Sequence, residues 1–253
     1  MLVSDLMSSP VHACRPDDTV SYVRNLMLKH HISRVLIMDR DRIAGIITKK
    51  DIGYRLRRYD PAWRRRPLDN DPVSAIMSRD ILSMSPDSSI HDALMFMVTH
   101  QISGFPVVDQ GMVLGIVTKS DMMRSSLVAT LDLPVTGVMH DVPTVTRKHS
   151  LDHVIDQMKD GCGKVVVAGE EGFLAGLISE SDLTFSQEGR DQLEKPLAGE
   201  IMRSPVITLP ISARTGEVIA EMTTRHISSI VITSDLEIKG IITRDDIIGE
   251  VVQ

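Results

Sequence analysis

Short apolar runs and polar turns alternate along the chain in a recurring order. In the first copy of this order, the run from Val35 to Met38 is too short for a helix and is rich in strand-forming residues. The polar residues 39–41 separate it from a second apolar run, Ile43 to Ile47. Two such runs around a short polar turn predict a β-hairpin.

The segment before this hairpin has helical spacing. Its apolar residues fall on one face of a helix: Val20, Val23, Leu26 and Met27. Residues 17–19, Asp-Asp-Thr, supply the capping chemistry expected at the start of that helix. A short β segment at 11–13 precedes it, and a second helix is predicted to begin near Thr48. The order is β-α-β-β-α, which predicts an α+β fold.

This order recurs four times along the chain. The clearest marker is the phrase Gly-apolar-apolar-(Thr/Ser)-x-x-Asp, which begins at Gly45, Gly115, Gly176 and Gly240. The glycines are 70, 61 and 64 positions apart (115−45, 176−115, 240−176). A methionine stands 37 or 38 positions before each of them, at Met7, Met77, Met139 and Met202. Two markers in register indicate a fourfold internal repeat.

The repeat divides the chain into four predicted units, at 1–57, 70–128, 134–186 and 195–253. One unit of roughly 60 residues buries little apolar surface by itself. We therefore expect the units to pair, giving modules 1–128 and 129–253. The third unit is the least regular, because Gly161-Cys162-Gly163 interrupts the stretch between its helix and its hairpin.

Composition adds two constraints. Aromatic residues make up only 3% of the 253 residues, whereas there are 15 methionines, so the core must be aliphatic and adaptable in shape. The net charge of −6 disfavours general nucleic-acid binding.

The cysteine spacing, and the lack of a signal peptide and of a long apolar run, bear on the cellular location of the protein and on metal binding. Cys14 and Cys162 are far apart, which suits a reducing compartment and gives no metal-binding cluster. There is no signal-peptide pattern and no apolar run near the ~18 residues of a membrane helix. These features predict a cytoplasmic protein without a membrane or metal partner.

The end of the repeated phrase has a structural explanation. A Thr or Ser at a helix N-cap, followed by an acid three residues on, is close to a capping box. An Asp in the first helical turn also suits the helix dipole. The four pairs are Thr48 and Asp51, Thr118 and Asp121, Ser179 and Asp182, and Thr243 and Asp246.

These repeated residues resemble the CBS-motif family, and the resemblance covers nearly the whole chain. In that family, two motifs pair about a pseudo-twofold axis to form a Bateman module. Four-motif members, such as the gamma subunit of AMP-activated protein kinase, assemble two modules into a flat disc. The resemblance implies four tandem CBS motifs in two such modules, as a monomeric disc or a homodimer, with no attached catalytic domain.

The resemblance also implies a ligand and roles for the repeated residues. Family members bind adenine nucleotides (AMP, ADP or ATP) in clefts between paired motifs, and some bind S-adenosylmethionine. The Asp carboxylate accepts hydrogen bonds from the ribose hydroxyls, and the Thr or Ser hydroxyl binds near the sugar or phosphate. No catalytic cofactor is implied.

The partner motif is implied to supply the base pocket and the phosphate donors. For the Asp121 and Thr118 site, these would be Val11, His12 and Ala13 at the adenine and His31, Ser33 and Arg34 at the phosphate. Arg34 can bind a phosphate through two parallel hydrogen bonds. The Asp121 site therefore ranks first.

The other three sites differ in their phosphate positions. The Asp246 site would use Thr144 and Val145 at the base and Lys164 at the phosphate, and ranks second. The Asp51 site has Ser103 and Gly104 at the basic positions. The Asp182 site has Ser228 and Ser229 there, with Arg225 and His226 nearby. The last two sites are expected to be weaker.

The sequence contains features of two other classes of function. Gly161 to Lys164 resembles the end of a phosphate loop, but the first glycine is missing and Val165 replaces the magnesium-binding Ser or Thr. His91-Asp92 has no matching nucleophile, so no enzymatic activity is expected.

The Arg-rich linker 54–71, with Tyr59 and Trp63, is the basis of the alternative: a scaffold or nucleic-acid-associated protein with vestigial or S-adenosylmethionine-type sites. The same arginines also fit a solvated connector or contacts to ligand phosphates. A regulated protein partner is compatible with either reading.

Overall fold

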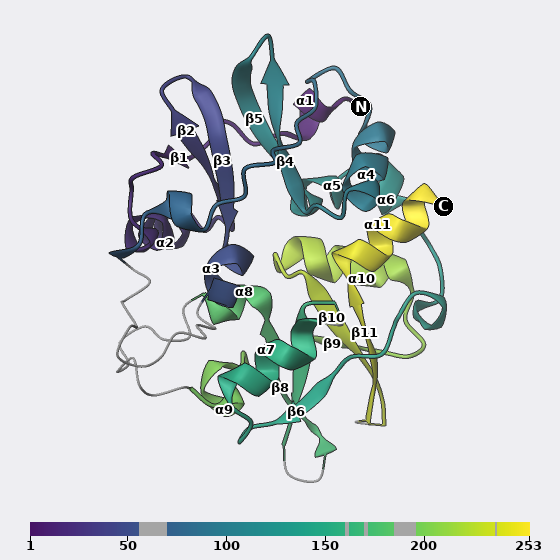
Figure 1. Cartoon of the computed structure of the whole chain (residues 1–253). Helices are drawn as coiled ribbons and strands as arrows, with labels where there is room; N and C mark the ends of the chain where they lie inside the picture. The colour runs from purple at the N-terminus through teal and green to yellow at the C-terminus, as the bar shows by residue number, and fades with distance from the viewer. Residues whose placement is uncertain (56–69, 160–161, 170–171, 185–195, 236) are drawn as a thin grey trace. The chain divides into compact units, whose positions relative to one another are not determined.

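The computed structural model of the chain describes residues 1–55, 70–159, 162–169, 172–184, 196–235 and 237–253 (Figure 1). Most of the Arg-rich linker 54–71 lies outside the described residues. The chain forms two compact units. Unit 1 comprises 1–11, 82–141 and 206–253, and unit 2 comprises 12–81 and 142–205. Each unit therefore contains one repeat from each predicted module, and the pairing into modules stays a prediction.

The first repeat has the predicted order of elements. They are β1 (Ala13–Cys14), α2 (Val20–Lys29), β2 (Arg34–Asp39), β3 (Arg42–Thr48) and α3 (Lys49–Arg55). The Thr19 hydroxyl caps α2 by accepting the N–H of Tyr22 at 3.2 Å. The predicted helical face is confirmed, with Val20, Val23 and Met27 buried. The first strand lies slightly later than the expected 11–13.

The second repeat departs from the pattern, because its first strand is reduced to a single bridge between Met84 and Val107. Its elements are α4 (Ile90–Thr99), β4 (Gly104–Asp109), β5 (Met112–Thr118), α5 (Lys119–Met122) and α6 (Ser126–Ala129). In the first repeat, Leu36 donates its N–H to the His12 carbonyl at 3.2 Å. Pro106 takes the place of Leu36 and has no N–H to donate. The predicted β-α-β-β-α order is therefore kept in repeat two with its first strand shortened to one bridge.

Repeats three and four regain the full order. The third contains β6 (Thr144–Thr146), α7 (Leu151–Lys159), β7 (Lys164–Ala168), β8 (Leu174–Ser179) and α8 (Glu180–Leu183). The fourth contains β9 (Thr208–Pro210), α10 (Thr215–Thr224), β10 (Ser229–Ser234), β11 (Glu237–Thr243) and α11 (Arg244–Val252). Each repeat is also preceded by a short helical turn that the pattern did not predict: α1 (Val3–Leu6), η3 (Val73–Ala75), η4 (Val135–Gly137) and α9 (Ala198–Ile201).

Each repeat builds its own small sheet around an antiparallel hairpin. The strand orders are β1-β2-β3, β4-β5, β6-β7-β8 and β9-β10-β11, and the first strand of each three-stranded sheet runs parallel to its neighbour. The register shifts by one residue at an equivalent place in every hairpin. The α+β class is confirmed. No helix in the described part of the chain has the length and apolar composition needed to cross a membrane.

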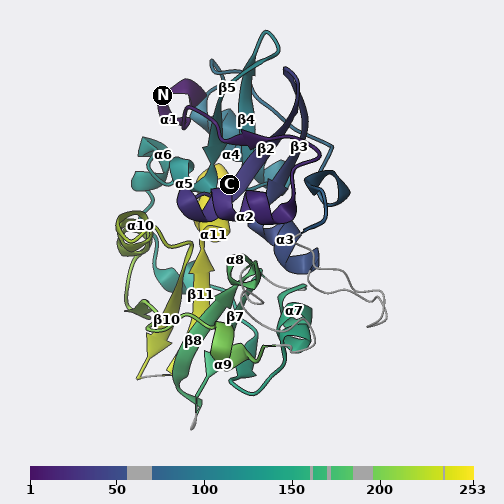
Figure 2. The same ribbon diagram turned by 90° about the vertical axis from the view of Figure 1, so that its left-hand side faces the viewer.

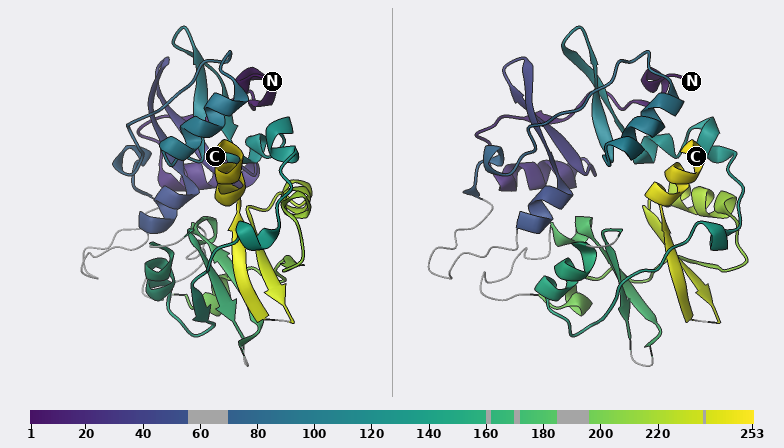
Figure 3. Two further views of the ribbon diagram at one scale, coloured as in Figure 1. Left: turned by 90° about the vertical axis from the view of Figure 1, so that its right-hand side faces the viewer. Right: turned by 45° about the vertical axis from the view of Figure 1, so that its right-hand side comes forward.

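Unit 1 has one continuous hydrophobic core. It joins residues of the second repeat, such as Met97 and Phe105, to residues of the fourth, such as Met222 and Ile248. Helix α11 contacts α4, α5 and α6, and the views in Figure 3 agree, with the yellow C-terminal helix beside the teal helices. Burial of aliphatic surface therefore holds these two repeats together.

Unit 2 has two separate cores. The first is built mainly by repeat one and includes Val73 and Met77 from the opening segment of repeat two, and the second is built mainly by repeat three and includes Ala198 from the opening segment of repeat four. Helices α3 and α8 join them and lie side by side in Figures 1 and 2. A Cβ atom on Gly53 would lie 2.9 Å from the Cβ of Leu183, so a glycine is needed for this close approach.

Each marker glycine accommodates the opening segment of another repeat. In unit 1, a Cβ on Gly115 would lie 2.7 Å from the Sδ of Met7, and a Cβ on Gly240 would lie 2.7 Å from the carbonyl oxygen of His140. Distances this short leave no room for a side chain. In unit 2, the corresponding Sδ distances are 2.5 Å for Met77 at Gly45 and 2.6 Å for Met202 at Gly176. The marker methionines thus pack on the glycine of a repeat other than their own.

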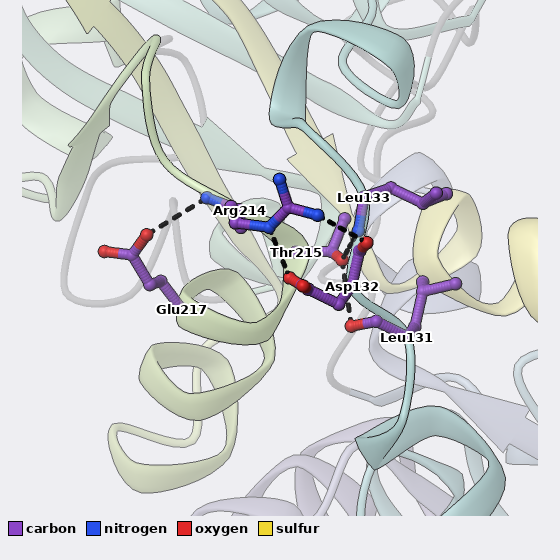
Figure 4. A network of polar contacts seen from close by, with 6 residues as sticks. All are labelled: Leu131, Asp132, Leu133, Arg214, Thr215 and Glu217. Atoms are coloured by element: carbon purple, nitrogen blue, oxygen red, sulfur yellow. Dashed lines mark hydrogen bonds and ion pairs between the residues drawn. The ribbon is translucent and has the colours of Figure 1, made fainter.

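A polar network fastens the chain between repeats two and three onto the start of α10 (Figure 4). The Thr215 hydroxyl, which is fully buried, accepts the N–H of Leu133 at 2.9 Å and donates to the carbonyl of Leu131 at 3.0 Å. Arg214 Nε donates to Asp132 Oδ1 at 2.6 Å, which raises the pKa of the guanidinium. Hydrogen bonds from Arg214 and Thr215 therefore hold residues 131–133 against the start of α10.

We expect Gly240→Ala to lower the free energy of unfolding by about 1–3 kcal/mol. The added Cβ would press on the His140 carbonyl, which accepts the N–H of Ile241 at 2.9 Å. Urea unfolding followed by circular dichroism measures the effect. Gly249→Ala in α11 is the matched control, because a Cβ there meets nothing within 4 Å and a helical Ala is favoured by up to ~1 kcal/mol. Equal effects of the two substitutions would refute the close-approach explanation.

We expect Thr215→Val to destabilise the protein by about 1–3 kcal/mol, because it leaves two buried main-chain groups without their hydrogen-bond partner. Thr215→Ser keeps the hydroxyl and removes only one methyl group, so the expected loss is smaller, about 1 kcal/mol. Thermal unfolding compares the two variants. A larger loss in Thr215→Ser would mean that methyl packing, not the hydroxyl, secures this segment.

Candidate functional site

The predicted Thr/Ser and Asp residues meet at the junction of each hairpin with its helix. In every repeat, one carboxylate oxygen, Oδ2, accepts both the N–H and the hydroxyl of the Thr or Ser three residues earlier. The N–H and hydroxyl distances are 2.8 and 2.7 Å at Asp51, 2.8 and 2.7 Å at Asp121, 2.8 and 2.5 Å at Asp182, and 2.6 and 2.7 Å at Asp246. The capping role predicted for the motif is confirmed.

The second oxygen, Oδ1, binds a basic side chain in three of the repeats. Arg124 donates to Asp121 at 2.8 Å, Arg203 Nε donates to Asp182, and His140 Nδ1 lies 3.2 Å from Asp246. Among the residues that the structure describes, none donates a hydrogen bond to Oδ1 of Asp51. The repeated motif did not predict any of these three basic partners.

The electrostatics of Asp246 reflect this arrangement. Burial raises the pKa of its carboxyl, but the hydrogen bonds from His140 and from the Thr243 hydroxyl and N–H outweigh that effect. The pKa of Asp246 therefore lies below its usual value. Its charged form is the one that the fold stabilises.

In unit 1, the motifs of repeats two and four contact each other directly. Lys119, which is buried, forms an ion pair with Asp245. In return, Arg244 donates to the Ser120 hydroxyl at 2.5 Å and to the Ile227 carbonyl at 2.8 Å. Burial lowers the pKa of Arg244, opposed by the nearby carboxylates of Asp121 and Asp245. The starts of α5 and α11 are thus locked together by charged groups.

In unit 2, the motifs of repeats one and three are joined in a related way. Lys50 pairs with Glu180 at 3.0 Å, and the Thr184 hydroxyl donates to the Lys49 carbonyl at 2.7 Å. Burial and the positive charge of Arg203 lower the pKa of Lys49, and the negative charge of Asp182 partly offsets them. The fold therefore disfavours the charged form of Lys49 relative to its form in water.

The predicted phosphate residues lie at the start of each hairpin. In register, Arg34 lies opposite Thr48 and Lys164 lies opposite Ser179, so each pair shares one face of its hairpin. The equivalents in unit 1 are Gly104, opposite Thr118, and Ser229, opposite Thr243. Arg34 is half-buried and Lys164 is buried.

The remaining phosphate candidates, His31 and Ser33, precede β2. His31 is exposed in a left-handed backbone conformation with φ of 54°, and the carbonyl of Ser33 accepts the N–H of Lys49 at 3.0 Å. Arg34 and Lys164 belong to unit 2, whereas Asp121 and Asp246 belong to unit 1. Their joint action on one ligand stays a prediction.

The predicted base-binding residues lie on or beside the first strands. Ala13 begins β1 and Thr144 begins β6, and both are exposed. Val145 is 1% exposed within the core, so only its main chain is available to a ligand. Val11 ends the first segment of unit 1. The adenine contacts of these residues stay predictions.

His12, the remaining base-pocket candidate, stacks its ring on that of His30. The ring centroids are 3.9 Å apart and tilted by 31°. Burial and the neighbouring charges of His12 and Lys29 lower the pKa of His30. No group of three or more His, Cys, Asp or Glu side chains that could hold a metal occurs in the described ranges.

The family of the chain follows from these repeated sites. The family model of the CBS domain matches residues 3–57, 73–127, 135–188 and 198–253. Each match covers one hairpin together with the helix that its Thr or Ser caps. The chain belongs to the CBS-domain family and carries four copies of the domain.

Several proteins resemble the chain over long stretches. The CBS domain-containing protein YhcV of Bacillus subtilis is 30% identical over 120 residues, which are 47% of this chain and 81% of that protein. Protein MJ1225 of Methanocaldococcus jannaschii is 25% identical over 259 residues and 92% of both chains.

Two solved structures share the fold over the whole length. The crystal structure of protein MJ1225 from Methanocaldococcus jannaschii has a TM-score of 0.86 with 23% identity over 99% of each chain. A conserved protein from Pyrococcus horikoshii has a TM-score of 0.66 with 17% identity over 100% of each chain. The fold of the chain is therefore shared by two solved structures over their whole length.

The lowered pKa of Asp246 predicts a pH dependence of stability. Its contribution is present above the usual Asp value of 3.8 and is lost as the pH falls through the lowered value. The difference in unfolding free energy between the wild type and Asp246→Asn should therefore be largest above about pH 5 and shrink toward pH 2.

Chemical unfolding of both proteins between pH 2 and pH 7 measures that difference. Asp141→Asn, at an exposed aspartate close to His140, serves as the control and is expected to change stability little throughout. A difference for Asp246→Asn that does not vary with pH would contradict the assignment.

Proposed function

We propose that this protein is a regulatory module without catalytic activity that binds adenine nucleotides, namely AMP, ADP or ATP. Four CBS domains support the proposal, because paired domains of this family hold adenosyl ligands. The observation that carries it is the carboxylate at the start of α3, α5, α8 and α11, held in one orientation by its capping bonds. A carboxylate fixed in this way is a ready acceptor for the two hydroxyls of a ribose.

Charge near these carboxylates supports a phosphorylated ligand. Unit 1 places Lys119, Arg124 and Arg244 around its two motifs, and unit 2 places Arg34 and Lys49 at the first of its own. AMP, ADP and ATP share the adenosine, whose ribose the aspartate would bind, and they differ in the charge of their phosphate groups. Basic groups at the helix starts would distinguish them by that charge.

Regulation follows from where the ligand would bind. A ligand on the motif aspartate acts at the first turn of a helix that also contacts the motif of another repeat, as α5 and α11 do in unit 1. Such a ligand shifts the conformation only by its different affinity for two states. A regulated protein partner would respond to this conformational change by contacting the helices.

The thiols support a reducing, cytoplasmic setting. Cys14 is buried, and burial, together with the nearby charge of Asp18, raises its pKa to about 12. Cys162 is partly exposed and free. A partly exposed free thiol persists where reducing agents protect it.

Calorimetry of the purified full chain tests the proposal directly. We expect AMP, ADP or ATP to bind at or below millimolar concentration, and S-adenosylmethionine is tested in parallel. Asp121→Asn should weaken binding about tenfold or more, because a charged acceptor of a ribose hydroxyl is lost. Thermal unfolding of the same variant separates lost binding from lost capping.

Asp109→Asn is the matched control, since Asp109 is an exposed residue at the far end of the same hairpin. It should leave affinity unchanged. If no adenosyl compound binds at millimolar concentration, the proposal is abandoned. A gel shift with nucleic acid that depends on the linker arginines would then favour the alternative of a nucleic-acid-associated scaffold.

A further inference from the structure

The residue that follows each marker methionine lies at an equivalent place in all four repeats. Isolated β-bridges pair it with the residue after the marker glycine, five positions before the motif aspartate. The bridges are Ser78 with Ile46, Ser8 with Ile116, Arg203 with Leu177 and His140 with Ile241. The backbone therefore places this residue beside the same strand position, five residues before the motif aspartate, in every repeat.

The side chain at this place differs between the two halves of the chain. In the second half it is basic, and it reaches the motif aspartate: Arg203 binds Asp182 and His140 binds Asp246. In the first half it is Ser78 or Ser8, and neither forms a hydrogen bond or ion pair with a motif aspartate in the described part of the chain. At the motifs of repeats one, three and four, the identity of this residue thus accounts for whether Oδ1 of the aspartate is occupied. At the motif of repeat two, where the residue is Ser8, Arg124 occupies Oδ1 of Asp121 instead.

Unit 2 contains both situations and allows a direct comparison. Asp182 has Oδ2 in its capping box and Oδ1 on Arg203, and its side chain is only 6% exposed. Asp51 has the same capping box, but no described side chain donates to its Oδ1. A ribose hydroxyl finds an available acceptor at Asp51 and an occupied one at Asp182.

We propose that Arg203 and His140 are built-in competitors for the ligand at the third and fourth repeats. Each occupies the carboxylate oxygen that a ribose hydroxyl would otherwise use, so a ribose ligand must displace it. Among the side chains that the structure describes, none donates to Oδ1 of Asp51, whereas Arg203 and His140 occupy Oδ1 of Asp182 and Asp246. This inference rests on the proposed function, and it differs from the sequence-based ranking, in which the Asp246 site stood second and the Asp51 and Asp182 sites were both weaker.

The competition is expected to be moderate. The Arg203 side chain is 76% exposed, so its ion pair with Asp182 is screened by water and contributes little net free energy. A ligand can therefore displace it at a modest loss of affinity, of about three- to tenfold. With such a loss of affinity, the site at Asp182 is occupied only at higher ligand concentration than an open site, but it still binds the ligand.

Adenosine is the appropriate probe, because it carries the ribose and no phosphate. We expect Arg203→Ser, which installs the residue of the first repeat, to raise adenosine affinity at one site about three- to tenfold in calorimetry of the full chain. Arg79→Ser removes an exposed arginine of the same unit that binds the Ser74 carbonyl instead. This matched control should leave adenosine binding unchanged.

The reciprocal exchange tests the open acceptor. Ser78→Arg should weaken adenosine binding by a similar factor, because the new side chain would reach Asp51 as Arg203 reaches Asp182. Thermal unfolding confirms that each variant is folded. If Arg203→Ser fails to fold, the result of Ser78→Arg decides the question.

The outcomes separate this inference from the proposed function. If the wild type binds AMP and neither exchange changes adenosine affinity, the competition is refuted while the proposed function stands. If Arg203→Ser weakens AMP binding and leaves adenosine binding unchanged, Arg203 is a phosphate ligand and the inference is overturned. If neither the wild type nor Arg203→Ser binds any adenosyl compound, both fail together.

Discussion

Every hairpin of this protein ends, and the following helix begins, at a single Thr or Ser whose N–H and hydroxyl both donate to one aspartate oxygen. This bond pair sets the direction in which the helix leaves the hairpin. The contacts of α11 with α5, and of α3 with α8, depend on that direction. The capping box is therefore the local constraint on which the association of repeats within each unit rests.

Fold and function share that carboxylate. Because Oδ2 is committed to the cap, only Oδ1 remains for a ligand or for a neighbouring basic side chain. Under the proposed function, a Ser, His or Arg at one position of the opening segment would change the access of a ligand to Oδ1 while the capping bonds stay the same. Differences between the repeats arise in the residues around the motif, while the motif itself is constant.

Features that depend on local spacing could be predicted from the sequence. The hairpins, the buried face of α2 and the capping boxes all follow from residues within a few positions of one another. The loss of the first strand in repeat two depends on Pro106 replacing a donor, which its alignment with Leu36 could have revealed. His140 lies 106 positions before Asp246 (246−140), and no local pattern indicates that they meet.

The exchange of opening segments has a consequence for the order in which the chain folds. Met77 reaches Gly45 across 32 positions (77−45), whereas Met7 must reach Gly115 across 108 (115−7). Closing the longer loop costs more conformational entropy. It also cannot occur until the second hairpin has been synthesised. During translation, the first repeat can complete its core early, while the N-terminal segment stays unplaced until the second repeat emerges. The same asymmetry recurs in the second half, where Met202 is 26 positions from Gly176 (202−176) and Met139 is 101 from Gly240 (240−139).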